Sequence, residues 1–140
     1  MKITYTDILS GVEANQIAAL YESVGFGDAC DYAGEDLISK IFGPGVFGFF
    51  AFDVARLVGM ARILSDDFVT SWIAEVCVAP EHQRQGIGST LLKMVNSRFA
   101  HTALYAEAFA HTVRLLEQAG ITSKSKLVAC SRAYIAPVQG

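Results

Sequence analysis

The sequence predicts a mixed α+β fold in which one sheet packs against helices. Three observations lead to this prediction. Hydrophobic residues make up 52% of the 140 residues and charged residues 18%, which suits a single domain (residues 1–140) with one core. Apolar runs of strand length alternate along the chain with segments of helical periodicity. In the middle, residues 72–99 pass from a strand through a glycine-rich turn into a helix.

The elements of the first half follow from periodicity and from stop signals. Residues 3–8 alternate enough to form a first strand. Apolar residues recur at helical spacing through about residues 12–24, where Gly25 and Gly27 stop the helix. A second, short helix at residues 37–42 ends at Gly43 and Pro44. Two apolar strands follow, at residues 46–52 and 57–64, joined by a hairpin-length connection.

The second half begins with the central strand, at residues 70–78. A long helix runs from Gly88 to Phe99, and residues 103–108 read as the next strand. A helix around residues 113–119 is closed by Gly120, and residues 127–134 are predicted as the final strand.

The turn at residues 83–88 is suited to binding a phosphate. Gly86 and Gly88 allow a close approach where a helix begins, the first helical amides have no partner, and the helix dipole favours an anion. A dinucleotide fingerprint would have glycine at Leu91, and a P-loop would have lysine at Ser89. The GxGxxG at residues 43–48 precedes a strand, so we interpret it as a loop.

This stretch resembles the acetyl-CoA signature of the GNAT superfamily of N-acetyltransferases, a strand ending in V-x-P and then Q/R-x-x-G-x-G/A opening a helix. Gln83, Gly86 and Gly88 occupy the defining positions, after Val78 and Pro80. The alternative is a tight turn that binds no ligand. The element order is also that of the GNAT fold. The resemblance therefore implies a twisted, mostly antiparallel sheet, splayed between strands 4 and 5, with about four helices.

Three further segments resemble the serotonin N-acetyltransferase-like branch of plastids and cyanobacteria and its bacterial relatives. They are residues 20–26 (LYESVGF), 59–66 (GMARILSD) and 75–80 (EVCVAP).

The resemblance implies how acetyl-CoA would be held. In this superfamily the pantetheine hydrogen-bonds along the central strand like an added strand, which here places it on the backbone of Val76, Cys77 and Val78. An amide near Val78 would steady the developing oxyanion. Gln83 is also expected to bind the cofactor. The pyrophosphate is expected at the backbone amides of Arg84, Gln85, Gly86, Ile87, Gly88 and Ser89.

Two carboxylates are candidate bases. In this superfamily the amine attacks the thioester directly, and an aliphatic ammonium, with a pKa of about 10.4, must first lose its proton. Glu75 stands where the serotonin-type enzymes carry an acid proposed as base, and Glu107 ends the neighbouring strand, where several members place a glutamate. The alternative for each is a solvated or core-edge ion pair.

The acceptor pocket of this family lies near the first loop, where Tyr21, Phe26 and Tyr32 are candidates, with core packing as the equal alternative. Arg62 would either shape this pocket or pair with Asp66.

One position departs from the family pattern. Members often carry, in L-Y-x-x-x-G-F of the last helix, a tyrosine that protonates the departing thiolate, but anchoring on Gly120 puts Leu116 there. A thiol has a pKa of only about 8.5, so a free thiolate is a tolerable leaving group. Tyr105, Tyr134 and Cys130 are possible substitutes. A nucleophilic role for Cys77 is disfavoured, since a small buried thiol on a strand is far commoner.

Composition argues against several other classes. The net charge of −3 gives no basic footprint for nucleic acid or an anionic membrane. The N-terminal residues lack a signal-peptide layout, so we expect a cytoplasmic protein. Three widely spaced cysteines offer neither a disulfide framework nor a metal knuckle, and the histidines lack ligand spacing, so no metal is expected.

We therefore expect an acetyl-CoA-dependent N-acetyltransferase that acts on a small primary amine, such as an arylalkylamine. The family resemblance also implies a homodimer that forms through the C-terminal strand. The alternatives are a non-catalytic acyl-CoA-binding or regulatory module and an acetyltransferase for peptide or protein amines.

Overall fold

A five-stranded mixed sheet forms the centre of the computed structural model, which describes residues 2–32, 34, 36–108 and 112–132. The strands lie in the order β1-β2-β3-β4-β5. The first four are antiparallel to their neighbours, and β5 runs parallel to β4, which confirms the predicted fold class. The strands are β1 (Ile3–Thr6), β2 (Val46–Asp53), β3 (Arg56–Ser65), β4 (Thr70–Val78) and β5 (Ala103–Ala106).

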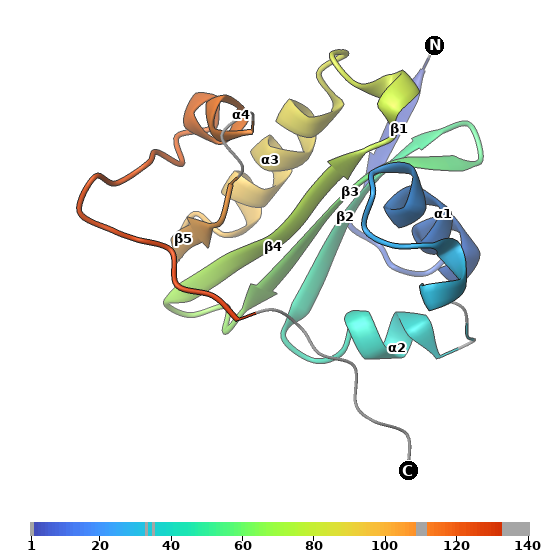
Figure 1. Cartoon of the computed structure of the whole chain (residues 1–140), viewed down its shortest axis with the longest axis horizontal. Helices are drawn as coiled ribbons and strands as arrows, with labels where there is room; N and C mark the ends of the chain where they lie inside the picture. The colour runs from blue at the N-terminus through green and yellow to red at the C-terminus, as the bar shows by residue number, and fades with distance from the viewer. Residues whose placement is uncertain (1, 33, 35, 109–111, 133–140) are drawn as a thin grey trace.

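Helices cover both faces of this sheet. Figure 1 shows α1 and α2 to one side of the strands and α3 and α4 to the other. The helical elements are α1 (Ala14–Ser23), the 3₁₀ turn η1 (Ala29–Tyr32), α2 (Leu37–Ile41), the 3₁₀ turn η2 (Pro80–His82), α3 (Ile87–Arg98) and α4 (Val113–Gln118).

The alternation of side chains along β3 assigns residues to the two faces. Gly59 faces α3 so closely that a Cβ there would lie 2.9 Å from Ile87 Cγ2 and 3.2 Å from Leu91 Cδ1. Because side chains alternate with period two, Ala61 and Ile63 also face α3, whereas Arg62 faces α1 and α2. The absence of a side chain at Gly59 therefore sets how closely α3 approaches the sheet.

The predicted stops of α1 and α4 are confirmed. Gly25 and Gly120 both adopt a left-handed conformation, with φ of 83° and 85°. The next residue in each case donates its amide back to the helix, from Phe26 to the Tyr21 carbonyl and from Ile121 to the Leu116 carbonyl, each at 2.9 Å. These are Schellman motifs, which use glycine because it adopts positive φ at little cost.

The prediction of a final strand at residues 127–134 is wrong for the residues that the structure describes. Residues 127–132 form no strand, and the side chains of Leu127 and Val128 are exposed. An apolar run becomes a strand only where a neighbour supplies backbone partners and a half-buried surface. Residues 133 and 134 lie outside the described residues, and the homodimer expected through this segment stays a prediction.

No helix within the described residues is long and apolar enough to cross a bilayer. The GxGxxG at residues 43–48 leads into β2, as expected for a loop.

Candidate active site

The sheet opens along one side of β4. β4 pairs with β5 only from Thr70↔Ala103 to Ile73↔Ala106. Its register with β3 shifts at the same level, where Arg62 pairs with Glu75 and Ile63 with Ile73, so that Ala74 is an extra residue. Such a bulge bends and twists a strand. Beyond it, no described residue pairs with β4 on the β5 side.

The free backbone groups on this edge belong to alternate residues. The amide of Ala79 donates to the Val58 carbonyl of β3 at 2.8 Å. Since successive residues of a paired strand turn their amides and carbonyls to opposite edges, Cys77 also faces β3, and Val76 and Val78 face the opening. Of the three residues predicted to bind pantetheine, Val76 and Val78 therefore direct their backbone groups to the opening, whereas those of Cys77 are directed to β3.

The N-terminus of α3 lies next to this edge and is uncapped. Its N-cap is Gly86, with φ of 84° and no side chain to accept a hydrogen bond. The amide of Thr90 is the first to find an intrahelical acceptor, the Gly86 carbonyl at 3.0 Å. Within the described structure, no protein acceptor takes the amides from Arg84 to Ser89. Arg84 is itself left-handed, with φ of 63°, a conformation that costs a non-glycine residue about 1–2 kcal/mol.

Gln83 connects this loop to the strand. Its Nε2 donates to the Val78 carbonyl at 3.0 Å, so the side chain occupies one of the outward carbonyls of β4 and fixes the start of the loop.

The β2–β3 hairpin holds the loop from the other side, a contact that the sequence did not predict. His82 Nε2 lies 2.9 Å from Asp53 Oδ2, and Arg56 forms an ion pair with Glu81. Ala55 in the same hairpin accepts a hydrogen bond from Gln16 Nε2 of α1 at 2.7 Å. The partners lie far apart in sequence, so no local pattern predicts these contacts. The only related signal is the hairpin-length connection at residues 53–56.

Glu75 is oriented by three neighbouring elements. Arg62 of β3 donates from Nε to Oε2 at 2.7 Å and from Nη2 to Oε1 at 2.6 Å, and its Nη1 donates to the Ile41 carbonyl of α2 at 3.2 Å. The Tyr21 hydroxyl of α1 donates to Glu75 Oε2 at 3.3 Å. Burial, and then the neighbouring carboxylate, raise the pKa of Tyr21, so the phenol stays protonated. Arg62 thus pairs with Glu75 and not with Asp66, which accepts loop amides.

Glu107, the second candidate base, lies just beyond the last residue of β5 and is exposed. The parallel register pairs Ile73 with Ala106, so Glu107 follows at the level where the sheet opens. No hydrogen bond or ion pair of the described structure joins it to Glu75.

The thiol of Cys77 is unsuited to nucleophilic chemistry. Its side chain is buried against β3, with Sγ 3.8 Å from the Met60 carbonyl. Burial, and next the charge of Glu75, raise the pKa of Cys77 to about 12, so the thiolate is scarce at neutral pH.

The aromatic residues of the predicted acceptor pocket form one cluster. The Tyr21 ring lies 5.8 Å from that of Phe26 and 4.9 Å from that of Tyr32, centroid to centroid. Tyr21 is buried, whereas Phe26 is exposed. The structure therefore joins Tyr21, Phe26 and Tyr32 to Glu75 through the Tyr21 hydroxyl.

Among the described residues, the structure identifies no substitute for the general acid that Leu116 replaces. Leu116 of α4 packs against the core. Tyr105 lies on β5 and stacks with Trp72, and Cys130 is exposed. Tyr134 lies outside the described residues.

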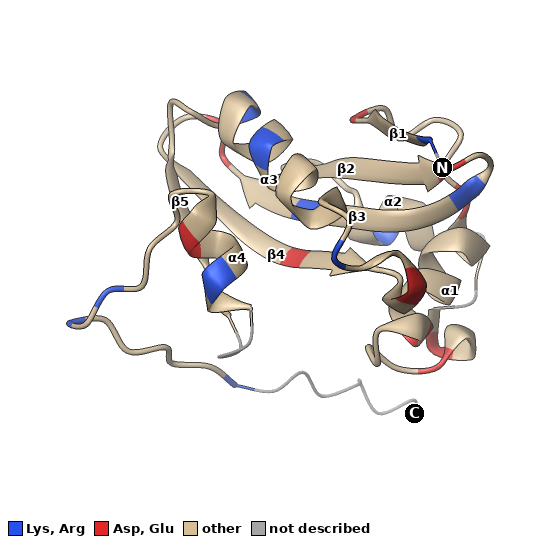
Figure 2. Ribbon diagram, turned by 90° about the horizontal axis from the view of Figure 1, so that it is seen from above, with Lys and Arg blue, Asp and Glu red and all other residues tan. Residues whose placement is uncertain are grey.

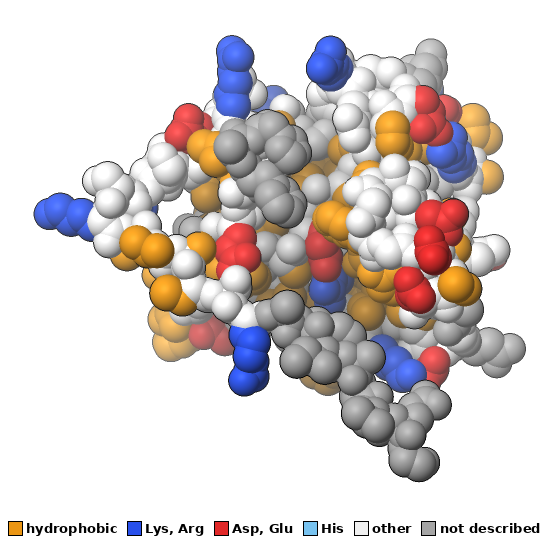
Figure 3. Space-filling view, viewed as in Figure 1, with side chains coloured by type: hydrophobic (Ala, Val, Ile, Leu, Met, Phe, Trp, Pro, Cys, Tyr) orange, Lys and Arg blue, Asp and Glu red, His pale blue; other side chains and the backbone are white. Residues whose placement is uncertain are grey.

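The surface is hollowed between these elements. Figure 3 shows a furrow between the part of the surface formed by α1 and η1 and the part formed by β5 and α4. Acidic residues lie along α1 and η1, as Figure 2 shows. Within the described residues, no three potential ligands gather as a metal site would require.

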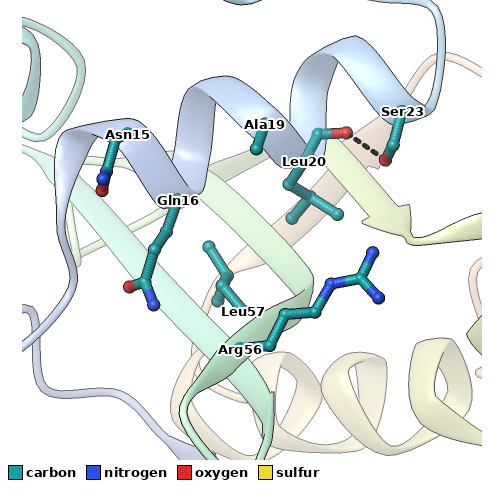
Figure 4. Close-up of a pocket in the computed structure, with 7 residues that line it drawn as sticks. All are labelled: Asn15, Gln16, Ala19, Leu20, Ser23, Arg56 and Leu57. Carbon is teal, nitrogen blue, oxygen red and sulfur yellow. Dashed lines mark hydrogen bonds between the residues drawn. The ribbon is translucent and has the colours of Figure 1, made fainter.

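A second hollow, of about 240 Å³, lies between α1 and the start of β3 (Figure 4). None of the predicted site residues lines it, and the guanidinium of Arg56 at its rim is already paired with Glu81. Its lining residues are Asn15, Gln16, Ala19, Leu20, Ser23, Arg56 and Leu57.

A sheet that splays after a β4 bulge, with an uncapped helix N-terminus beside the splay, is the arrangement that the GNAT fold predicts. A model of the Acetyltransferase (GNAT) family matches residues 13–120, and the chain belongs to this family. A search of curated proteins found no match.

Solved structures support the fold. A GNAT-family acetyltransferase from Streptococcus pneumoniae TIGR4 is 25% identical, with a TM-score of 0.68 over 96% of this chain and 97% of that chain. A protein of unknown function from meticillin-resistant Staphylococcus aureus is 16% identical, with a TM-score of 0.80 over 95% of this chain and all of the other. An aminoglycoside acetyltransferase from an uncultured soil metagenomic sample is 17% identical, with a TM-score of 0.69 and coverage of 95% and 100%.

Proposed function

We propose that this protein is an acetyl-CoA-dependent N-acetyltransferase for a small primary amine, a class that includes arylalkylamines. The observation that carries the proposal is the run of amides from Arg84 to Ser89, which have no acceptor among the described residues, beside the open edge of β4. GNAT proteins generally use acetyl-CoA, which supplies an activated acetyl thioester when bound. The likeness of residues 20–26, 59–66 and 75–80 to the serotonin N-acetyltransferase-like branch supports an arylalkylamine acceptor.

The residues present fit this donor. Gly86 has open space where a Cβ would stand, so a diphosphate can approach the backbone at the helix dipole. The outward backbone groups of Val76 and Val78 offer strand-like hydrogen bonds to a pantetheine, although Gln83 already occupies the Val78 carbonyl.

The acceptor side favours a cation. Residues 3–39 contain seven Asp and Glu residues and neither Lys nor Arg. These acidic residues include Glu22, Asp28 and Asp31, close to the aromatic cluster that adjoins Glu75. An ammonium is attracted by such a field and by aromatic faces.

The reaction needs one proton removed and one supplied. Glu75 or Glu107 accepts a proton from the ammonium, directly or through water, because the amine attacks only when neutral. The new N–C bond replaces the C–S bond, and the departing thiolate takes its proton from water, since Leu116 offers none. An outward amide of β4 near Val78 stabilises the developing oxyanion.

A second candidate, a non-catalytic acyl-CoA-binding module, is favoured by two observations. Leu116 stands in place of the usual acid, and both oxygens of Glu75 already accept hydrogen bonds from Arg62. This candidate predicts coenzyme A binding without transfer to any amine, and Leu116→Tyr would then change nothing.

Thiol release from acetyl-CoA, measured with arylalkylamines, alkylamines and a peptide with a free N-terminus, decides between the candidates. We expect transfer to a small amine and a loss of at least about 100-fold in kcat in the Glu75→Gln, Glu107→Gln double variant. Glu117→Gln, at an exposed position on α4, is the matched control. Equal rates in the wild type and the double variant would defeat the catalytic proposal, and transfer to the peptide alone would identify a peptide acetyltransferase.

A further inference from the structure

We propose that the apolar part of the acceptor amine docks on a row of three exposed side chains, Leu64, Trp72 and Tyr105, which we name the aryl platform. This inference rests on the proposed function and deepens it. It assigns the acceptor class to primary amines that carry an aromatic ring on a short linker.

The strand register places the three residues side by side. Leu64 of β3 pairs with Trp72 of β4, and Trp72 pairs with Tyr105 of β5. Their side chains therefore stand on one face of three adjacent strands. The rings of Trp72 and Tyr105 are nearly parallel, 19° apart, with their centroids separated by 6.4 Å.

The aryl platform lies on the same face as the candidate base. Leu64 comes two residues after Arg62 on β3, so both side chains point to the α1 and α2 side of the sheet. Arg62 pairs across to Glu75, and Leu64 pairs across to Trp72. Trp72 and Glu75 are separated by three positions of a bulged strand, which is about 10 Å or less. One small molecule can therefore place an ammonium at Glu75 and a ring at Trp72.

The exposure of these residues contrasts with the other face. Leu64, Trp72 and Tyr105 are 42%, 38% and 46% exposed, whereas Ile63, Ser71 and Ile73, which alternate with them, are buried. By contrast, Tyr21 and Arg62, two of the acceptor residues predicted from sequence, already bind Glu75. Phe26, beside Tyr21, is also 38% exposed, but it lies on the loop after α1, whereas the aryl platform is an open aromatic surface on the sheet face that carries Glu75.

The chemistry of the surroundings selects an aromatic amine over other apolar ligands. Stacked aromatic rings offer an offset face to a third ring, which contributes about 0.5–1.5 kcal/mol beyond the buried area. The acidic residues of α1 and η1 add attraction for a cation at the end of the molecule near Glu75, whose own charge is balanced by Arg62. Three side chains are also far fewer than the roughly 20 residues per partner of a standard protein interface.

The test uses matched amines and the single tryptophan. In the wild type we expect 2-phenylethylamine to be acetylated with a kcat/KM at least about tenfold above that of n-propylamine. Trp72→Ala should raise the KM for 2-phenylethylamine about tenfold and leave the KM for n-propylamine and for acetyl-CoA within about twofold, while Trp72→Phe restores most of the preference. Phe68→Ala, at a 77% exposed aromatic residue outside the row, is the control and should change none of these constants.

Tryptophan fluorescence separates this proposal from the proposed function. Since Trp72 is the only tryptophan, its emission should change saturably with 2-phenylethylamine in the presence of coenzyme A, and Tyr105→Ala should weaken that binding. If 2-phenylethylamine changes the emission of Trp72 but no amine is acetylated, the aryl platform is supported and the proposed catalytic function is wrong. Turnover without an aryl preference would overturn the aryl platform. So would a Trp72→Ala variant that dissociates a dimer, seen by sedimentation, without a selective change in KM, because the occupant would then be a second copy of the chain.

Discussion

At the scale of single residues, the Arg62–Glu75 pair decides how the centre of the site is arranged. The pair is bidentate and mostly buried, and it receives the Tyr21 hydroxyl as a further donor. The guanidinium geometry fixes both carboxylate oxygens in one plane. The pair therefore restrains Glu75 in direction, and it also ties β3 and β4 to the helices above them.

Breaking this pair should cost stability. Arg62→Leu leaves the Glu75 carboxylate without its partner in a mostly buried place, and we expect the free energy of unfolding to fall by about 3 kcal/mol. Urea unfolding of Arg62→Leu, Glu75→Gln and the double variant measures the coupling. The double variant should lose less than the sum of the single variants. Additive losses would show that the two side chains do not interact in solution.

The three cysteines should differ in reactivity. Because burial holds the pKa of Cys77 near 12, its thiol stays protonated and inaccessible at neutral pH, whereas Cys30 and Cys130 are exposed. Iodoacetamide treatment of the native protein, read by mass spectrometry, should modify Cys30 and Cys130 and spare Cys77 until denaturant is added. Rapid native labelling of Cys77 would show that β4 opens readily.

At the scale of elements, the sequence predicts those features that local chemistry determines. Gly25 and Gly120 end their helices because each occupies a left-handed position that glycine favours, and the nearby residues already carry that signal. Gly86 likewise adopts a left-handed conformation, here at the N-cap of α3. The contacts of His82 with Asp53 and of Glu75 with Arg62 join different strands and turns, and no local pattern encodes the pairing of one charge with a particular distant partner.

The predicted final strand shows where prediction from the sequence fails. Residues 127–132 have the composition of a strand, but a strand depends on a partner edge that composition does not specify. The splay of the sheet was predicted only through the family resemblance. Its local cause in the structure is the register shift at Ala74, and the sequence around this residue has no glycine or proline to mark a bulge.

The hairpin contacts of η2 lead to a prediction for the phosphate loop. Asp53 holds His82, which immediately precedes Gln83, so loss of this contact should loosen the loop amides before they meet a ligand. We expect Asp53→Ala to weaken coenzyme A binding about fivefold to tenfold by calorimetry, since a less ordered site must be fixed on binding. Asp53→Asn, which keeps an oxygen acceptor, should retain most of the affinity. Equal affinity of Asp53→Ala and the wild type would show that the hairpin does not position the loop.

At the scale of the whole molecule, one charged cluster closes the end of the sheet away from the phosphate loop. Arg98, from the end of α3, donates from both Nη atoms to the Asp67 carboxylate at 2.8 Å, and His101 Nε2 lies 3.0 Å from Asp67 Oδ1. The guanidinium also lies over the rings of Phe47 and Phe99, 5.1 and 4.8 Å from their centroids. The cluster joins the β3–β4 turn to α3 and β2, so its charge state bears on the cohesion of the entire fold.

Acid should therefore weaken the fold through Asp67. The hydrogen bonds from Arg98 lower the pKa of Asp67 to about 2, from an ordinary value of 3.8. A carboxylate with a lowered pKa in the folded state stabilises it fully above about pH 4, and this contribution is lost as the pH falls toward 2. Thermal unfolding across pH 2–7 should show a lower Tm for Asp67→Asn than for the wild type above pH 4, and the two curves should converge near pH 2. Asp28→Asn removes the same charge from an exposed carboxylate that forms no ion pair with any described residue, so its Tm should follow the wild type at every pH. A constant difference between wild type and Asp67→Asn down to pH 2 would mean that the pairing with Arg98 does not depend on the ionised carboxylate.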